Sequence, residues 1–201
     1  LDGRFCRLEP LSVARHAADL WRHLANQDAV WDYLPIAAPK GEAEYHAILA
    51  SMVANEAIVP LAVIDRADGE AKGHCWIMEI RPAHGVFEIG YITWSPAMQR
   101  TPMATEAVYL VGDLGFRLGY RRYEWKCNNR NEPSKRAAER FGFTWEGLFR
   151  QHMVVKGQNR DTAWYSITDG EWPARKRRFE AWLDPANFGM DGRQARRLQE
   201  I

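Results

Sequence analysis

The stretch Gln99-Arg100-Thr101-Pro102-Met103-Ala104-Thr105-Glu106 decides the fold of this 201-residue chain. It follows an alternating run that ends at Trp94, and it opens a segment with apolar residues at helical spacing as far as Leu118. A strand, a turn and a helix are therefore expected in this order. The start of a helix exposes unpaired backbone N–H groups and a partial positive charge, so the turn is typical of a site that binds a diphosphate.

A second motif lies one predicted strand further along the chain. Asn131 is a suitable N-cap for a helix over residues 132–141, Ser134 lies in its first turn, and Gly142 follows its end. Taken singly, each motif also fits an ordinary capped helix at the surface. Their order and spacing together favour a shared binding site.

The two motifs together resemble the GNAT superfamily of N-acetyltransferases. The first corresponds to the pyrophosphate loop, with the pattern Gln/Arg-x-x-Gly-x-Gly/Ala, and the second to the helix that flanks the pantetheine arm of CoA. The resemblance covers about residues 3–170. Four further segments resemble the RimJ/RimL-type branch, the ribosomal-protein N-terminal acetyltransferases and their relatives: Glu88 to Ile92, Thr105 to Ala107, Glu146 to Leu148, and Asp161 with Trp164 to Ile167.

The resemblance implies an α/β GNAT fold, with a mixed, mostly antiparallel central sheet that contains splayed strands and is flanked by helices. The splayed strands are expected at residues 86–94 and 122–127, and an antiparallel meander is expected before them. Residues 1–170 would form the acetyltransferase domain, and residues 171–201 a C-terminal helix and tail that pack on it. After Asp184 the tail is expected to be loosely ordered.

Acetyl-CoA is the acetyl donor that the resemblance implies, and no metal is expected. Its pyrophosphate would bind at the turn, its pantetheine amides would pair with strand backbone near Ile92 and Trp94, and the Asn-led helix would flank the arm. The residues expected to bind it are Ile92, Trp94, Gln99, Arg100, Thr101, Met103, Ala104, Thr105, Asn131 and Ser134.

Pro102 stands where the family pattern has its first glycine. Proline suits the first position of a helix, but it has no N–H, so the loop has one donor fewer. The hydroxyls of Thr101 and Thr105 or the guanidinium of Arg100 are expected to compensate. The departure keeps a second class of function open, a degenerate GNAT-fold binding or regulatory module with weak or no CoA binding.

Direct attack of an amine on a thioester requires a base for the amine, a donor for the oxyanion and a proton for the departing thiolate. Many GNAT proteins use a tyrosine in the Asn-led helix for the last task, but Ala138 stands at that position. Ser134 matches the serine of RimL-type relatives. Glu88 and His152 are preferred for the base because of their places in the chain. All candidates for the base are Glu88, Glu146, His152 and Asp161.

The acceptor is expected to be a primary amine, either a protein N-terminus, as the RimL-like segments suggest, or a small molecule. Trp31 and Tyr33 lie in an aromatic loop and are expected to line its site. Most of the other tryptophans are expected in the core.

Charge and composition exclude several other functions. Lys and Arg number 27 against 26 Asp and Glu, so the net charge of +1 creates no global field for nucleic acid or a membrane surface. No apolar run approaches the roughly 20 residues of a membrane span, and the first residues lack a signal pattern, so a soluble cytoplasmic protein is expected. Cys6, Cys75 and Cys127 are expected to be buried free thiols. Apolar residues in the C-terminal helix favour a homodimer.

Overall fold

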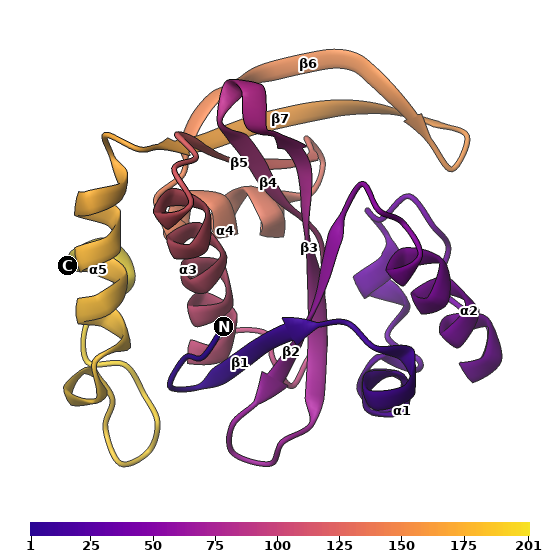
Figure 1. Cartoon of the computed structure of the whole chain (residues 1–201), viewed down its shortest axis with the longest axis horizontal. Helices are drawn as coiled ribbons and strands as arrows, with labels where there is room; N and C mark the ends of the chain where they lie inside the picture. The colour runs from indigo at the N-terminus through magenta and orange to yellow at the C-terminus, as the bar shows by residue number, and fades with distance from the viewer.

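The computed structural model describes all residues from 1 to 201, and one sheet runs through its centre (Figure 1). The strands are β1 (Cys6–Pro10), β2 (Val59–Asp65), β3 (Ala71–Arg81), β4 (Val86–Trp94), β5 (Arg122–Asn128), β6 (Thr144–Val155) and β7 (Gln158–Thr168). The α-helices are α1 (Val13–Leu24), α2 (Glu42–Val53), α3 (Pro102–Arg117), α4 (Glu132–Phe141) and α5 (Trp172–Leu183). Short 3-10 helices are η1 (Asp28–Trp31), η2 (Pro82–His84), η3 (Pro185–Asn187) and η4 (Leu198–Glu200).

The seven strands lie in the order β1-β2-β3-β4-β5-β7-β6. Every neighbouring pair is antiparallel except β4 and β5, which run parallel and are joined by α3. The expected α/β fold with a mixed, mostly antiparallel sheet is therefore confirmed. The long β6–β7 hairpin curves over the sheet toward the side of α2 (Figure 1).

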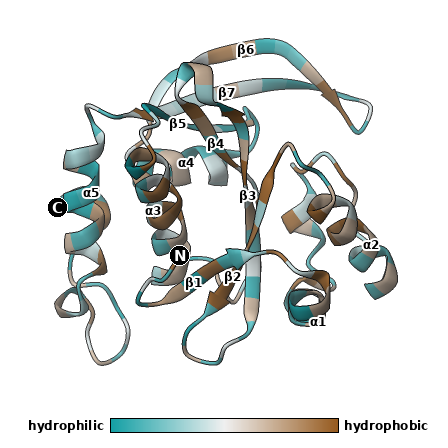
Figure 2. Cartoon of the chain, in the orientation of Figure 1, coloured by the Kyte–Doolittle hydropathy of each residue, from teal (hydrophilic) through white to brown (hydrophobic).

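Helices cover both faces of the sheet and divide the core in two. The larger core lies between the sheet and α3, α4 and α5, and the smaller core lies under α1 and α2. Figure 2 shows the hydrophobic residues gathered on the central strands and on α3. A Cβ at Gly115 of α3 would lie 2.1 Å from the ring of Phe87 on β4, so the glycine allows the close approach of helix and strand.

The C-terminal segment packs on the domain, so the prediction of a loosely ordered tail after Asp184 is wrong. Leu198 is only 2% exposed, and the indole N–H of Trp182 donates to Gln194 Oε1 at 2.8 Å. The reason is that the tail folds back and supplies both apolar and polar partners to α5. The pattern of apolar residues alone did not reveal this return.

The large apolar residues of α5 are likewise buried in the larger core, so they offer no surface for a homodimer. Exposed apolar side chains gather instead on the edge strand β6. They are Trp145, Leu148, Phe149, Met153 and Val154. Trp145 is therefore one of the tryptophans that lie outside the core.

Cys6, Cys75 and Cys127 are free and buried, as predicted. No helix combines the length and the apolar character that a membrane crossing requires.

Candidate active site

The two central strands separate part of the way along their length. β4 and β5 pair only at Val86 with Arg122, Phe87 with Tyr123 and Glu88 with Glu124. Beyond Glu88, β4 continues to Trp94 without a strand partner on this side. The edge that it leaves open is the kind that accepts the amides of an extended ligand.

A β-bulge bends β4 just after the last paired residue. Trp76 of β3 faces Gly90 and His74 faces Thr93, so β4 has one more residue than β3 between these pairs. Tyr91, inside this bulge, adopts the left-handed backbone conformation with a φ of 51°, which is strained for a residue other than glycine. Its ring stacks on Trp76 with 3.7 Å between the ring centroids, which holds the bulge in place.

The turn after β4 is tied to the strand by side chains. Gln99 Nε2 donates to the carbonyl of Trp94 at 2.9 Å, and the Thr101 hydroxyl donates to the carbonyl of Met98 at 2.6 Å. Arg100 has a φ of 62°, the left-handed conformation that turns successive amides toward one side. Pro102 is the first residue of α3, as expected from its fixed φ.

Three backbone amides of this turn remain without an acceptor in the chain, those of Arg100, Met103 and Ala104. The Thr101 amide donates to the carbonyl of Met98 at 3.3 Å, so it is not a free donor. The start of α3 thus keeps a set of free N–H groups even though Pro102 contributes none.

Arg140 is a residue of this region that sequence reasoning missed. Its Nη1 donates to the Thr105 hydroxyl at 2.9 Å, and its guanidinium lies over the ring of Trp182. It forms no ion pair, and burial lowers its pKa. Nothing in the local pattern of α4 indicates that a side chain from its last turn reaches α3.

Ser134 lies in the first turn of α4 and contacts β5. Its backbone N–H donates to Asn131 Oδ1 at 3.1 Å, which confirms the predicted N-cap. Its hydroxyl accepts a hydrogen bond of 3.0 Å from the indole N–H of Trp125 on β5. Successive strand residues point to opposite faces, so Ser134 is on the face of β5 that carries Trp125 and Cys127.

Glu88 lies on the other face of the sheet and is only 5% exposed. Lys126 Nζ lies 2.7 Å from Glu88 Oε2 and 3.0 Å from Glu124 Oε2. The contact with Glu88 is an ion pair without a well-aligned hydrogen bond. Burial raises the pKa of Glu88 to about 7, against the opposing effect of Lys126. A carboxylate that titrates near neutral pH suits a general base.

Glu146, one of the four candidates for the base, is engaged elsewhere. It forms an ion pair with Arg122 and accepts from the Ser166 hydroxyl at 2.7 Å. The hydrogen bond from Arg122 lowers its pKa, which makes it a weaker base.

Asp161, another candidate, is bound within the β6–β7 hairpin. It accepts from the Gln151 amide at 2.7 Å and from Asn159 Nδ2 at 3.0 Å. The backbone hydrogen bond lowers its pKa. The arrangement indicates a role in shaping the hairpin.

His152 lies on β6 and is exposed. Its Nδ1 is 2.9 Å from the Thr162 hydroxyl, and its ring centroid is 5.9 Å from that of Trp164. Lys126 Nζ lies 4.2 Å from the centroid of the same indole. Trp164 therefore separates His152 from the Lys126–Glu88 pair on one face of the sheet.

The aromatic loop reaches two other elements. Trp31 is 2% exposed, and its side chain packs on Tyr45 in the smaller core. Only its backbone contacts the β6–β7 hairpin, because its carbonyl accepts a hydrogen bond from Lys156 Nζ at 2.7 Å. Tyr33 is 37% exposed, and its hydroxyl donates to the carbonyl of Arg130 at 3.0 Å. The loop thus bridges to the β6–β7 turn and to the start of α4.

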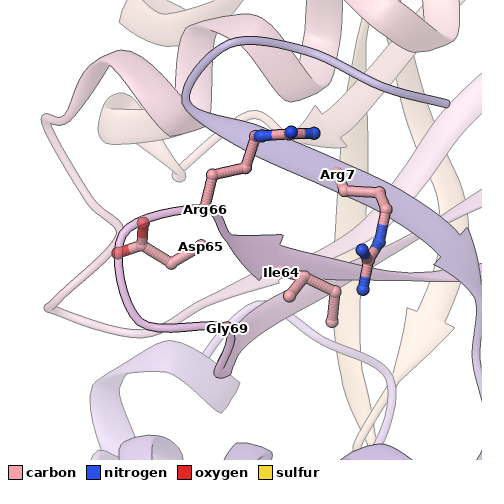
Figure 3. A pocket seen from close by; sticks show the side chains of 5 residues that line it. All are labelled: Arg7, Ile64, Asp65, Arg66 and Gly69. Carbon is pink, nitrogen blue, oxygen red and sulfur yellow. The ribbon is translucent and has the colours of Figure 1, made fainter.

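Two hollows in the surface contain, of all the predicted site residues, only Asp161. One lies in the β6–β7 hairpin and is lined by polar residues, among them Asp161. The other lies at the β2–β3 turn, where Arg7, Asp65 and Arg66 surround it (Figure 3). These charges already have partners in Glu9, Lys72 and Asp2. The separated strands therefore define the site better than either hollow.

Residues 6–144 match the model of the acetyltransferase (GNAT) domain family. The chain belongs to the GNAT acetyltransferase family. It is an acyltransferase enzyme, and acetyltransferases of this family use acetyl-CoA as a substrate. The comparisons lend no support to a degenerate binding module. No curated protein sequence matches the chain significantly.

Solved structures support the same family. A GCN5-related N-acetyltransferase from Brucella melitensis has 48% identity and a TM-score of 0.97, with 99% of this chain and 91% of that chain covered. A probable GNAT-family acetyltransferase from Chromobacterium violaceum has 43% identity and a TM-score of 0.81, with 86% and 87% covered.

A more distant structure shares the fold alone. It is the Salmonella typhimurium acetyltransferase that modifies the N-terminal serine of a 50S ribosomal subunit protein, with 18% identity, a TM-score of 0.70, and 83% of this chain and 96% of that chain covered.

Proposed function

We propose that this GNAT enzyme moves the acetyl group of acetyl-CoA to a primary amine by direct attack within a ternary complex. The observation that carries the proposal is the separation of β4 from β5 beyond Glu88, with the free amides of α3 at the open end. Acetyl-CoA supplies an activated acyl group with a thiolate leaving group. All other requirements of the reaction fall to the residues of the chain.

Donor binding is assigned to the open edge of β4 and to the turn that follows it. Backbone near Ile92 and Trp94 would bind the pantetheine amides, and the N–H groups of Arg100, Met103 and Ala104 would bind the diphosphate. Gln99 and Thr101 would hold the turn, and Asn131 would hold the start of α4. The guanidinium of Arg140, which donates to the Thr105 hydroxyl, would add a positive charge near the same helix terminus.

The catalytic groups would approach from opposite faces of the sheet. Glu88 would accept the proton of the attacking amine, and its pKa near 7 leaves about half of it ionised at neutral pH. Ser134 would donate a hydrogen bond to the departing sulfur. Backbone N–H groups of the bulged strand would stabilise the oxyanion. His152 remains a second candidate for the base because it lies on the same face as Glu88.

The acceptor would enter on the face of Glu88, under the β6–β7 hairpin. Tyr33 would line this entrance, whereas Trp31 would support it through the contact of its carbonyl with Lys156. The Salmonella enzyme makes a protein N-terminus one acceptor to test, beside small amines. We also infer a cytoplasmic location, with which three buried free thiols agree. A homodimer remains a prediction.

Mass spectrometry tests the proposal. The protein is incubated with acetyl-CoA and a panel of short peptides and small amines, and products are compared with those of the Glu88→Gln variant. We expect a gain of about 42 Da, the net change when an acetyl group replaces one hydrogen, on at least one amine, at a rate about a hundredfold lower with the variant. Acetylation of O–H or S–H groups instead of any amine would contradict the proposal.

A further inference from the structure

The indole of Trp125 is held rigidly beside Ser134. Trp125 is 4% exposed, and its ring centroid lies 5.9 Å from that of Phe141 and 5.5 Å from that of Phe143. Contacts from two buried rings fix the direction of the indole N–H bond. That bond points at Ser134 Oγ, with a distance of 3.0 Å between the heavy atoms.

The hydroxyl of Ser134 has its own proton free. It accepts from Trp125, and the chain offers it no acceptor at hydrogen-bond geometry. A hydroxyl group has one donor and two lone pairs, so occupation of a lone pair by the indole turns the O–H bond away from Trp125. The backbone of Ser134 is fixed as well, through the bond of its amide to Asn131. The rotation of the hydroxyl is thus restricted from two sides.

Cys127 is a buried thiol on the same face of β5 as Trp125. Burial raises the pKa of Cys127, and the Ser134 hydroxyl opposes the rise because it stabilises the thiolate form. Cys127 and Trp125 lie two residues apart on one face of β5. The direction of this effect agrees with a hydroxyl that faces the Cys127 side of β5.

We propose that Trp125 is a positioning residue that aims the Ser134 hydroxyl at the departing sulfur. The inference rests on the proposed function, in which Ser134 serves the leaving group. As the bond between carbon and sulfur breaks and the bond between nitrogen and carbon forms, the amine proton passes to Glu88. The sulfur leaves as a thiolate that accepts the hydrogen bond from Ser134 and later takes a proton from water. Ser134 itself keeps its proton.

A double-mutant cycle distinguishes positioning from general packing. Ser134→Ala is expected to lower kcat about tenfold or more, and Trp125→Phe, which keeps an aromatic ring but removes the N–H, about threefold to tenfold. The decisive expectation is that Trp125→Phe has no further effect in the Ser134→Ala background. If Trp125→Phe lowers kcat by the same factor in both backgrounds, the proposal is overturned, because the effect of packing does not depend on Ser134. Acetyl-CoA affinity is expected to fall by a smaller factor than kcat in each variant.

Trp172→Phe is the matched control, because this buried indole packs against Phe116 and Tyr109 and makes no hydrogen bond to Ser134. It should behave additively with Ser134→Ala. Any coupling of similar size between these two would show that the cycle reports stability alone.

A second measurement applies even if Trp125→Phe fails to fold. In the ¹⁵N-labelled wild-type protein, the Trp125 indole proton is identified by its contacts with the ring of Phe143, and Ser134→Ala is expected to move it upfield. An unchanged resonance would overturn the proposal without any acceptor. A shifted resonance together with full activity of Ser134→Ala would keep the hydrogen bond but remove the catalytic role of Ser134, so both the inference and that part of the proposed function would fall.

Discussion

Glu88 and Glu124 are the last residues at which β4 and β5 face each other in register. Two buried carboxylates at this place repel each other unless a cation lies between them. Lys126 fills that position, within 3.0 Å of both side chains. The point at which the sheet opens is therefore also the point at which a carboxylate with a raised pKa lies next to the gap.

The pH dependence of the reaction should report Glu88. A base acts in its ionised form, so kcat/KM is expected to rise with pH and level off above a pKa of about 7, which burial sets. In Glu88→Gln this rise of kcat/KM with pH should disappear, and the remaining activity should be about a hundredfold lower. Initial rates between pH 5.5 and about 9 are the measurement. His152→Asn is the matched variant. If His152→Asn removes the rise of kcat/KM with pH and Glu88→Gln keeps it, the base is His152.

Stability should depend on pH through the same group. The folded pKa of Glu88 lies above the value near 4.3 of an unfolded chain. The stability that the raised pKa of Glu88 contributes to the folded state is therefore fully present below that value, and it is lost as the pH rises through about 7. Glu88→Gln should gain stability relative to wild type between about pH 4 and 7, as measured by urea unfolding. A stability difference independent of pH would show that the pKa is not raised.

Pro102→Gly should strengthen donor binding. Glycine restores an N–H at the start of α3, and one more bond to a phosphate oxygen is worth about 1 kcal/mol, or roughly fivefold in Kd for acetyl-CoA. Helix stability should fall slightly, because proline is well suited to this position. Pro96→Gly, at an exposed proline of the same loop, is the control. Equal affinities of wild type and Pro102→Gly would mean that the diphosphate does not bind at this turn.

Glu106 should be essential for stability. Its carboxylate accepts from the backbone amides of Arg4, Phe5 and Cys6, each at 2.7 Å. Glu106→Ala leaves these amides without a partner and is expected to cost about 3 kcal/mol or more in the free energy of unfolding. Glu56→Ala, at an exposed side chain without an ion pair, should change it by less than about 0.5 kcal/mol. A small effect of Glu106→Ala would show that the N-terminal segment is held by other contacts.

Most of the fold was predictable because its signals are local. The alternation of β4, the proline at the start of α3 and the Asn131 cap each depend on residues close in sequence. The limits of β4 and α4 agree with the predicted ones for this reason. The return of Leu198 to the core was not predictable, because its partners lie on distant elements.

In the candidate site, too, local features were predictable and contacts between distant elements were not. Ser134 and Asn131 could be selected from a motif, but the bond from Trp125 to Ser134 depends on how β5 and α4 pack. The meeting of Arg140 with Thr105 and the ion pair of Lys126 with Glu88 likewise join residues more than 30 positions apart. Trp31 was selected for its aromatic ring, yet it is its carbonyl that contacts the hairpin.

Calorimetric titration of the wild-type protein with acetyl-CoA tests the central claim, that the separated strands β4 and β5 form a CoA site. We expect one site per chain with micromolar affinity, about −8 kcal/mol. Binding should weaken markedly in Ala104→Pro, which removes a second free amide at the start of α3 and leaves the rest of the turn in place. The absence of binding heat for both wild type and Pro102→Gly, in protein shown to be folded, would contradict the account.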